Sequence, residues 1–117
     1  MTITRPHRVA VIACPPVTTF DLSIPGVVFG ATSLGGRPAY EVTVCTLVPG
    51  VVEARYGTDV VVPCGLDAVE RADTVMVTGT ADRDGTDPRV LDALRAAAAR
   101  GARIASSYRA AARTRWP

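Results

Sequence analysis

The sequence contains no lysine, asparagine or glutamine, only one histidine, and aromatic residues at just 5% of its 117 positions. One histidine and three cysteines without C-x-x-C spacing are too few ligands for a zinc site, and an odd number of cysteines argues against a disulfide framework. No apolar run approaches the ~20 residues of a membrane span, and residues 1–8 lack the apolar stretch of a secretory signal. We therefore expect no metal, no membrane association and a cytoplasmic protein.

The sequence also lacks several motifs that bind cofactors or carry out catalysis. Neither G-x-G-x-x-G nor a Walker sequence occurs, so nothing supports nucleotide binding and we expect no cofactor. Ser106 and Ser107 are not surrounded by G-x-S-x-G, and His7 stands before the first predicted strand without a partner. A serine hydrolase is therefore disfavoured.

Charge is low overall and uneven along the chain. The formal net charge of +2 is too small to indicate nucleic-acid binding. Residues 1–102 hold nine arginines against eleven acidic residues, whereas residues 103–117 hold four arginines and no acid. A basic end of this kind either binds phosphates or is a frayed or non-native end, and both interpretations stay open.

The apolar residues that are present predict one α/β domain. A chain of 117 residues with 48% hydrophobic content suits a single globular domain. Residues 8–14 form a continuous apolar run, typical of a central parallel strand covered on both faces. Strands that alternate with helices predict a parallel sheet with helices on both sides. Further strands are expected over 40–47, 74–78 and 103–106, a short helix over 66–71, and longer helices after Asp21 and Asp87.

Local signals predict where the first long helix begins and ends. Asp21 is expected to be its N-cap, with Pro25 in the first turn, where early N–H groups have no intrahelical acceptor. Gly35-Gly36 is expected to end it. Its buried face is predicted from helical spacing to comprise Ile24, Val27, Val28, Ala31 and Leu34.

Two further segments carry clear signals. Asp87 as N-cap, Pro88 in the first turn and Gly101 as the stop predict the last helix. Residues 51–63 contain two short β-rich runs about Tyr56-Gly57, which predict a hairpin or an excursion at the edge of the sheet.

Candidate site residues follow from the rule that parallel sheets place their sites at the carboxyl ends of strands. Cys14 ends the first strand, whereas Cys45 and Cys64 suit small buried hydrophobes. Gly79 either serves a turn or donates its N–H to an oxyanion. Asp21 either caps its helix or orients a nucleophile.

The order of these pieces resembles the ThiJ/PfpI, or class I glutamine-amidotransferase-like, superfamily. The segments that carry the resemblance are Arg8-Val-Ala-Val-Ile-Ala, Phe20-Asp-Leu-Ser-Ile-Pro with Val28-Phe-Gly, Tyr40-Glu-Val-Thr-Val-Cys, Ala72-Asp-Thr-Val-Met-Val-Thr-Gly-Thr-Ala-Asp, Leu91-Asp-Ala-Leu-Arg and Arg100-Gly-Ala-Arg-Ile-Ala-Ser. They look most like the N-terminal domain of AraC-type transcriptional regulators. The resemblance implies a flavodoxin-like three-layer sandwich with a mainly parallel sheet. We expect its N-terminal portion only, with residues 1–106 as part of that domain and 107–117 as a basic tail that departs from the family.

The resemblance also implies roles for individual positions. In the superfamily the acid at the position of Asp21 pairs with a nucleophilic cysteine. Gly79 lies where the family forms an oxyanion hole, and Thr80 is a further site position inherited from the family. The nucleophile position is Tyr108, where a phenol with a pKa near 10 cannot replace a thiolate at neutral pH. Cys14 and Ser106 fall at the edge where a ligand would bind. We therefore expect no catalytic residue and no metal ligand.

The function implied is that of a non-catalytic ligand-sensing or dimerisation domain of an AraC-type regulator. The alternative is a cysteine-dependent ThiJ/PfpI enzyme, a hydrolase, hydratase or glyoxalase-like member cut before its nucleophile. A chain ending at Pro117 is expected to be a truncation or a shifted reading frame after an authentic strand. Expected partners are a second copy of the chain and an unknown small-molecule effector, with DNA bound only through a domain absent from this chain.

Overall fold

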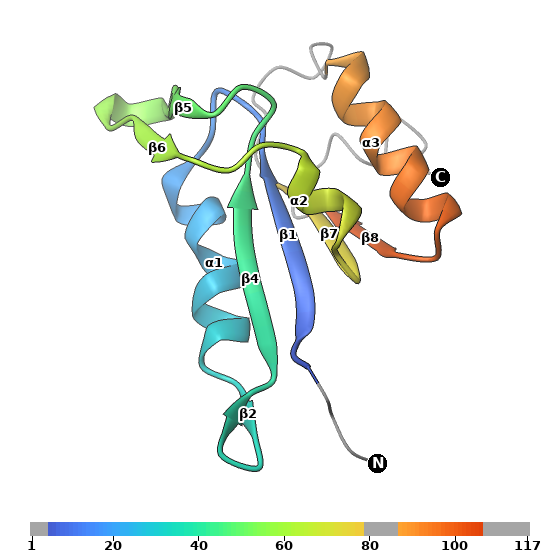
Figure 1. Cartoon of the computed structure of the whole chain (residues 1–117). Coiled ribbons are helices and arrows are strands. Elements are labelled where there is room, and N and C mark those ends of the chain that lie inside the picture. Colours follow the sequence, from blue (N-terminus) through green and yellow to red (C-terminus); the bar gives the residue numbers. More distant parts are fainter. Residues whose placement is uncertain (1–4, 79–86, 107–117) are drawn as a thin grey trace.

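A four-stranded parallel sheet organises the protein. The structure, a computed structural model, describes residues 5–78 and 87–106. The strands of the sheet lie in the order β4-β1-β7-β8 and every neighbouring pair is parallel (Figure 1). Their bounds are β1 His7–Ala13, β4 Tyr40–Cys45, β7 Thr74–Thr78 and β8 Arg103–Ser106.

The continuous apolar run became the central strand, as predicted. Residues Val9 to Ala13 are each at most 2% exposed, because β4 and β7 flank β1 and both faces of the sheet are covered there. The more alternating strand β4 lies at one edge, and its residues before Cys45 are exposed or half-buried. The predicted α/β class and parallel sheet are therefore confirmed.

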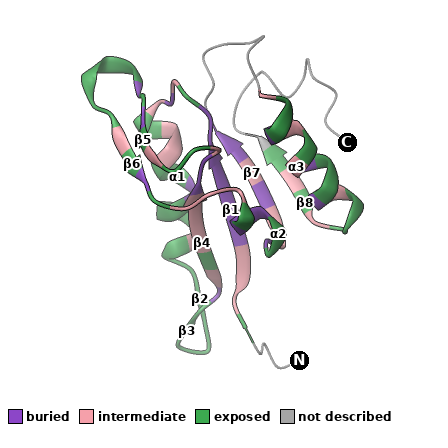
Figure 2. Ribbon diagram, turned by 45° about the horizontal axis from the view of Figure 1, so that its top comes forward, coloured by how far each residue is buried: buried purple, intermediate pink, exposed green. Residues whose placement is uncertain are grey.

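Helices cover both faces and create two separate cores, which Figure 2 shows as buried strands between exposed outer surfaces. Helix α1 (Thr19–Gly30) packs over β1 and β4 on one face. Helices α2 (Asp67–Glu70) and α3 (Pro88–Ala99) pack on the other face. The arrangement is the predicted three layers.

Helix α3 forms where its capping signals place it. The Asp87 carboxylate accepts a hydrogen bond from the Arg89 N–H at 2.8 Å, and Pro88 occupies the first turn. Gly101 follows the helix with φ +98°, a conformation that favours glycine. Helical spacing predicts that Val90, Leu91, Leu94 and Ala98 share one face. Of these Val90 and Leu94 are buried, together with Ala97.

The predicted ends of α1 are wrong. The helix begins at Thr19 with Thr18 as N-cap, so Asp21 lies inside the first turn and is not the cap. Pro25 is buried within the helix and not in its first turn. The helix ends at Gly30, and Gly35-Gly36 instead form the turn of a small hairpin between β2 (Ser33–Leu34) and β3 (Arg37–Pro38). Their φ values of +60° and +78° are those of a two-residue hairpin turn, which competes with a helix stop for the same glycine pair.

The predicted buried face of α1 is also wrong. Leu22 packs in the core on this side of the sheet and Pro25 is buried, whereas the predicted residues Ile24, Val27, Val28, Ala31 and Leu34 are exposed. The helical spacing of the apolar residues is real, but it exists on more than one side of the helix. Periodicity therefore identified an apolar face without showing which face meets the sheet.

The segment after β4 forms the predicted hairpin. Strands β5 (Gly50–Val52) and β6 (Val60–Val62) pair antiparallel, and a 3-10 turn, η1 (Arg55–Gly57), lies between them. Val52 and Val62 are buried against Ala13 and Val17, so the hairpin closes the core on the α1 side.

Asp73 joins the amino ends of three strands. Its carboxylate accepts hydrogen bonds from the Arg5 guanidinium at 2.8 and 3.1 Å and from the Arg8 N–H at 2.9 Å. Its backbone N–H donates to the Arg8 carbonyl at 2.8 Å, and its own carbonyl accepts from the Arg103 N–H at 3.0 Å. The hydrogen bonds from Arg5 and from the Arg8 N–H hold the pKa of Asp73 well below its usual range.

Replacing Asp73 by asparagine tests this junction. At neutral pH Asp73→Asn should lower the free energy of unfolding by roughly 1 kcal/mol, a value that allows for solvent screening of the exposed Arg5 partner. A lowered folded pKa stabilises the protein above the unfolded value of about 3.9, and this contribution is lost as the pH falls through the folded pKa. The difference between wild type and variant in urea unfolding should therefore shrink below about pH 4.

The control is Asp92→Asn, which removes an exposed carboxylate that only approaches Arg95, at 3.5 Å, along the same helix. It should change the free energy of unfolding little at any pH. A constant difference between wild type and Asp73→Asn from neutral pH down to pH 3 would contradict the prediction.

Candidate functional site

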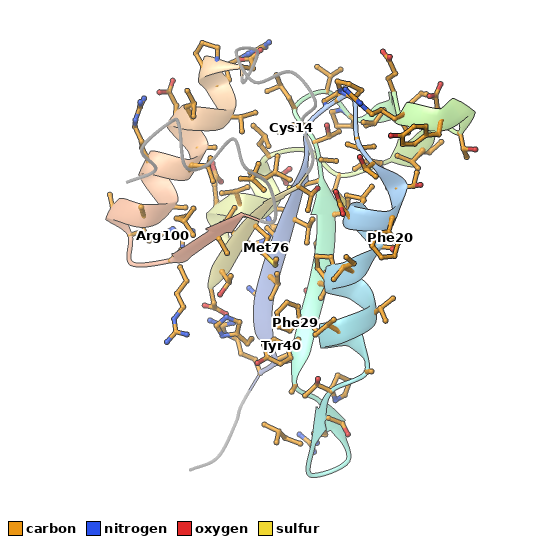
Figure 3. The ribbon with its side chains drawn as sticks, turned by 180° about the vertical axis from the view of Figure 1, so that it is seen from behind. Cys14, Phe20, Phe29, Tyr40, Met76 and Arg100 are labelled. Carbon is orange, nitrogen blue, oxygen red and sulfur yellow. The ribbon has the colours of Figure 1, made fainter. Side chains whose placement is uncertain are left out.

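The carboxyl ends of β1, β4 and β7 meet at one edge of the sheet, where Cys14 follows β1 (Figure 3). Two buried hydroxyls hold this edge together. Thr46 donates to the Ala13 carbonyl at 2.8 Å, and Thr78 donates to the Ile12 carbonyl at 3.2 Å. Both hydroxyls therefore have partners, which buried polar groups require. The backbone just before Cys14 is thus tied to both neighbouring strands.

Sequence reasoning missed Thr46 and Thr78. The available signal was a threonine at the end of each apolar strand that flanks β1, where a hydroxyl must find an acceptor if it is buried. Their role is to position the edge.

Cys14 is buried, with 7% of its surface exposed. Burial raises the pKa of the Cys14 thiol to about 11, since the thiolate loses its solvation. At neutral pH the group is a neutral thiol, and a thiol is a poor nucleophile compared with its thiolate. The described environment of Cys14 therefore disfavours covalent catalysis by this thiol.

Asp21 lies on the first turn of α1, which starts just after this edge, and its side chain is half-buried. The first turn of a helix favours a carboxylate because unpaired N–H groups point toward it. Thr18 is the N-cap of α1, so the predicted capping role of Asp21 is wrong. Cys14 and Asp21 are thus the predicted site residues that the described chain brings to this edge.

Of the remaining predicted site positions, the structure describes only Ser106. Ser106 is the last residue of β8 and pairs in register with Val77 on β7. Gly79, Thr80 and Tyr108 lie outside the described residues. Their predicted roles therefore stay predictions.

The other two cysteines also lie at this end of the sheet. Cys45 is fully buried, as predicted, whereas Cys64 is partly exposed. Burial, together with the nearby Cys64 and Cys14 thiols, raises the pKa of Cys45 to about 12. Within the described part of the chain, no group of three or more His, Cys, Asp or Glu side chains is arranged to hold a metal ion.

A broad open concavity of about 1050 Å³ lies at the opposite, amino ends of the strands. Phe29 and Tyr40 (Figure 3), whose ring centroids are 4.7 Å apart, line it. His7 also lines it and meets Tyr40 edge-on, with ring centroids 5.7 Å apart. Neither Cys14 nor Asp21 lines this concavity. It lies across the amino ends of β7 and β8, and we assign no ligand to it.

No helix in the described ranges is long and apolar enough to cross a membrane. No family model matches the sequence, and no curated protein does.

Solved structures share the fold. An AraC family transcriptional regulator from Pseudomonas putida aligns with a TM-score of 0.73 and 20% identity, over 86% of this chain and 55% of the other. A ThiJ/PfpI family protein from Pseudomonas syringae aligns with a TM-score of 0.70 and 18% identity, over 87% and 42%. A DJ-1 superfamily protein from Agrobacterium tumefaciens aligns with a TM-score of 0.63 and 17% identity, over 86% and 52%. The fold implied by the resemblance is confirmed, and the chain spans about half the length of these structures.

The thiol environments predict different reactivities. With iodoacetamide at pH 7.5, Cys64 should be alkylated in the folded protein at least about ten-fold faster than Cys14, because a buried thiol with a raised pKa forms little accessible thiolate. Cleavage after Glu41, Glu53 and Glu70 separates the three cysteines into different peptides for mass spectrometry. Unfolding in urea should equalise the rates. Alkylation of native Cys14 as fast as Cys64 would show that Cys14 is an accessible nucleophile.

Proposed function

We propose that this chain is the N-terminal portion of a non-catalytic ligand-sensing or dimerisation domain of an AraC-type transcriptional regulator. The observation that carries the proposal is the apolar character of α1 on the side that faces away from the sheet. The shared fold with an AraC family regulator supports it.

The polar side chains of α1, those of Thr19, Asp21 and Ser23, all lie in its first half, and the rest of its surface is apolar. Its outward residues Phe20, Ile24, Val27 and Val28 are 71%, 39%, 69% and 55% exposed. They recur at helical spacing and form one stripe, and Figure 3 shows Phe20 on the side away from the sheet. Asp21 is the one charged residue of the helix. A contiguous exposed apolar stripe of this kind marks a surface that a partner covers.

The neighbouring hairpin extends the apolar surface. Val51 is 70%, Val61 73% and Tyr56 88% exposed. The hairpin and α1 share one core through Leu22, and both views place them side by side (Figures 1 and 2). Exposed apolar surface of this kind marks an association site. We assign it to a second copy of the chain, because dimers are the commonest protein assemblies and pair identical patches.

A sensing role fits the carboxyl edge better than catalysis does. Cys14 is a buried neutral thiol, and Asp21 offers a half-buried acceptor close to where β1 ends. In the proposal, a small effector binds at this edge near Asp21 and Gly79, and the bound state changes how two copies associate. DNA would be read by a domain outside this chain, in the cytoplasm.

Sedimentation velocity tests the association. The wild-type chain should sediment as a dimer at micromolar concentration, and Val27→Asp should shift it to monomer by placing a charge in the centre of the stripe. Ala99→Asp is the matched control, since it adds the same charge at an exposed position of α3 on the opposite face. It should remain dimeric. A monomeric wild type, or a Val27→Asp variant that still dimerises, would refute the proposed interface.

Enzyme assays test the non-catalytic part. Turnover of methylglyoxal and of amide and peptide substrates by the purified chain should equal that in buffer, because burial raises the pKa of Cys14, the cysteine at the carboxyl edge, to about 11 and keeps it a neutral thiol at neutral pH. Activity that Tyr108→Phe or Cys14→Ser abolishes would instead favour the cysteine-dependent enzyme.

A further inference from the structure

Cys45 and Cys64 lie directly opposite each other in the structure. Cys45 is the last residue of β4, and Cys64 forms an isolated parallel bridge with it on the chain between β6 and α2. The Thr46 N–H donates to the Cys64 carbonyl at 2.9 Å and fixes this pairing. Neighbouring strands lie about 4.8 Å apart, which is inside the range of about 4.4–6.8 Å that a disulfide needs between its two Cα atoms.

The two side chains also point to the same side. Cys45 belongs to the core under α2 and α3, and Cys64 packs against that core. Opposite residues of a parallel pair project from the same face of a sheet, so the backbone pairing agrees with the packing. The Cys64 thiol contributes to the raised pKa of Cys45, which is consistent with two sulfur atoms close together.

We propose that Cys45 and Cys64 form a reversible intramolecular disulfide when the protein meets a peroxide. The thiolate of Cys64, the partly exposed member, attacks one peroxide oxygen; the S–O bond forms, the O–O bond breaks, and hydroxide leaves. The Cys45 sulfur then attacks the Cys64 sulfenic acid. The S–S bond forms, the S–O bond breaks, and the Cys45 proton leaves with the hydroxide as water. The proton that Cys64 lost on forming its thiolate joins the hydroxide released by the peroxide. Two thiols and one hydrogen peroxide thus give one disulfide and two waters.

The exposure of the two residues sets the order of these steps. The fully buried Cys45 cannot meet the oxidant first, whereas Cys64 can. Cys14 shares the same core, but no backbone pairing places it opposite either residue. The disulfide would fasten the segment that leads into α2 to the end of β4, beside the edge that carries Cys14. The proposal does not depend on the protein being a regulator.

Peptide mapping of the full chain tests the proposal. The protein is treated with hydrogen peroxide, free thiols are blocked with N-ethylmaleimide, and the chain is cleaved after glutamate. Peptides 42–53 and 54–70 should appear joined, while the peptide that carries Cys14 stays separate and blocked. The intact chain should lose the mass of two hydrogens and remain one chain on a non-reducing gel. Dithiothreitol should reverse both changes.

Three variants complete the test, so that its result does not depend on one substitution that destabilises the fold. Cys64→Ser and Cys45→Ala should each abolish the joined peptides, whereas Cys14→Ser should retain them. Three results would overturn the proposal: Cys64 oxidised to sulfinic acid with no joined peptide, a link that involves Cys14, or a link between two chains. Each can be seen in the wild-type protein alone.

Discussion

Burial of β1 on both faces is the constraint on which the rest of this structure depends. Its N–H and C=O groups are satisfied by β4 on one side and β7 on the other, because no water reaches them. Its side chains alternate between two cores, with Ala10 and Ile12 under α2 and α3 and Ala13 under the hairpin. A strand with one apolar face would have needed only one of these layers.

The same strand determines what the carboxyl edge can do. The Thr46 and Thr78 hydroxyls donate hydrogen bonds to carbonyls at the end of β1. The backbone that leads into Cys14 is therefore fixed, and Cys14 lies buried at the edge. Burial keeps the thiol protonated, which disfavours nucleophilic chemistry. At the other end of the sheet, Asp73 joins the strands at their amino ends through an ion pair with Arg5 and a hydrogen bond from the Arg8 N–H.

The two long helices cover their faces of the sheet differently. Helix α3 buries Val90, Leu94 and Ala97 and presents Arg89, Asp92 and Arg95 outward, as a helix at a protein surface does. Helix α1 buries Pro25 and still presents Phe20, Val27 and Val28 to solvent. This difference is the physical reason for assigning association to the α1 side.

The sequence by itself determined the elements whose signals are local. The unbroken apolar run 8–14 predicted a central strand, and Asp87, Pro88 and Gly101 predicted α3 closely, because caps and glycine stops act within one turn. It also predicted that Cys14 follows the carboxyl end of β1, since the end of an apolar run is a local signal. These predictions required no knowledge of what packs against what.

Only the tertiary structure decided three features: which face of α1 packs on the sheet, whether Gly35-Gly36 ends a helix or forms a hairpin turn, and that Cys45 pairs with Cys64. An apolar helix offers several faces to a sheet, and the sheet accepts the one that fits, which here contains Pro25. A glycine pair suits a helix stop or a hairpin turn equally, and the pairing of β2 with β3 selects the turn. Cys64 meets Cys45 because the hairpin returns the chain beside β4, a long-range register that no local pattern encodes.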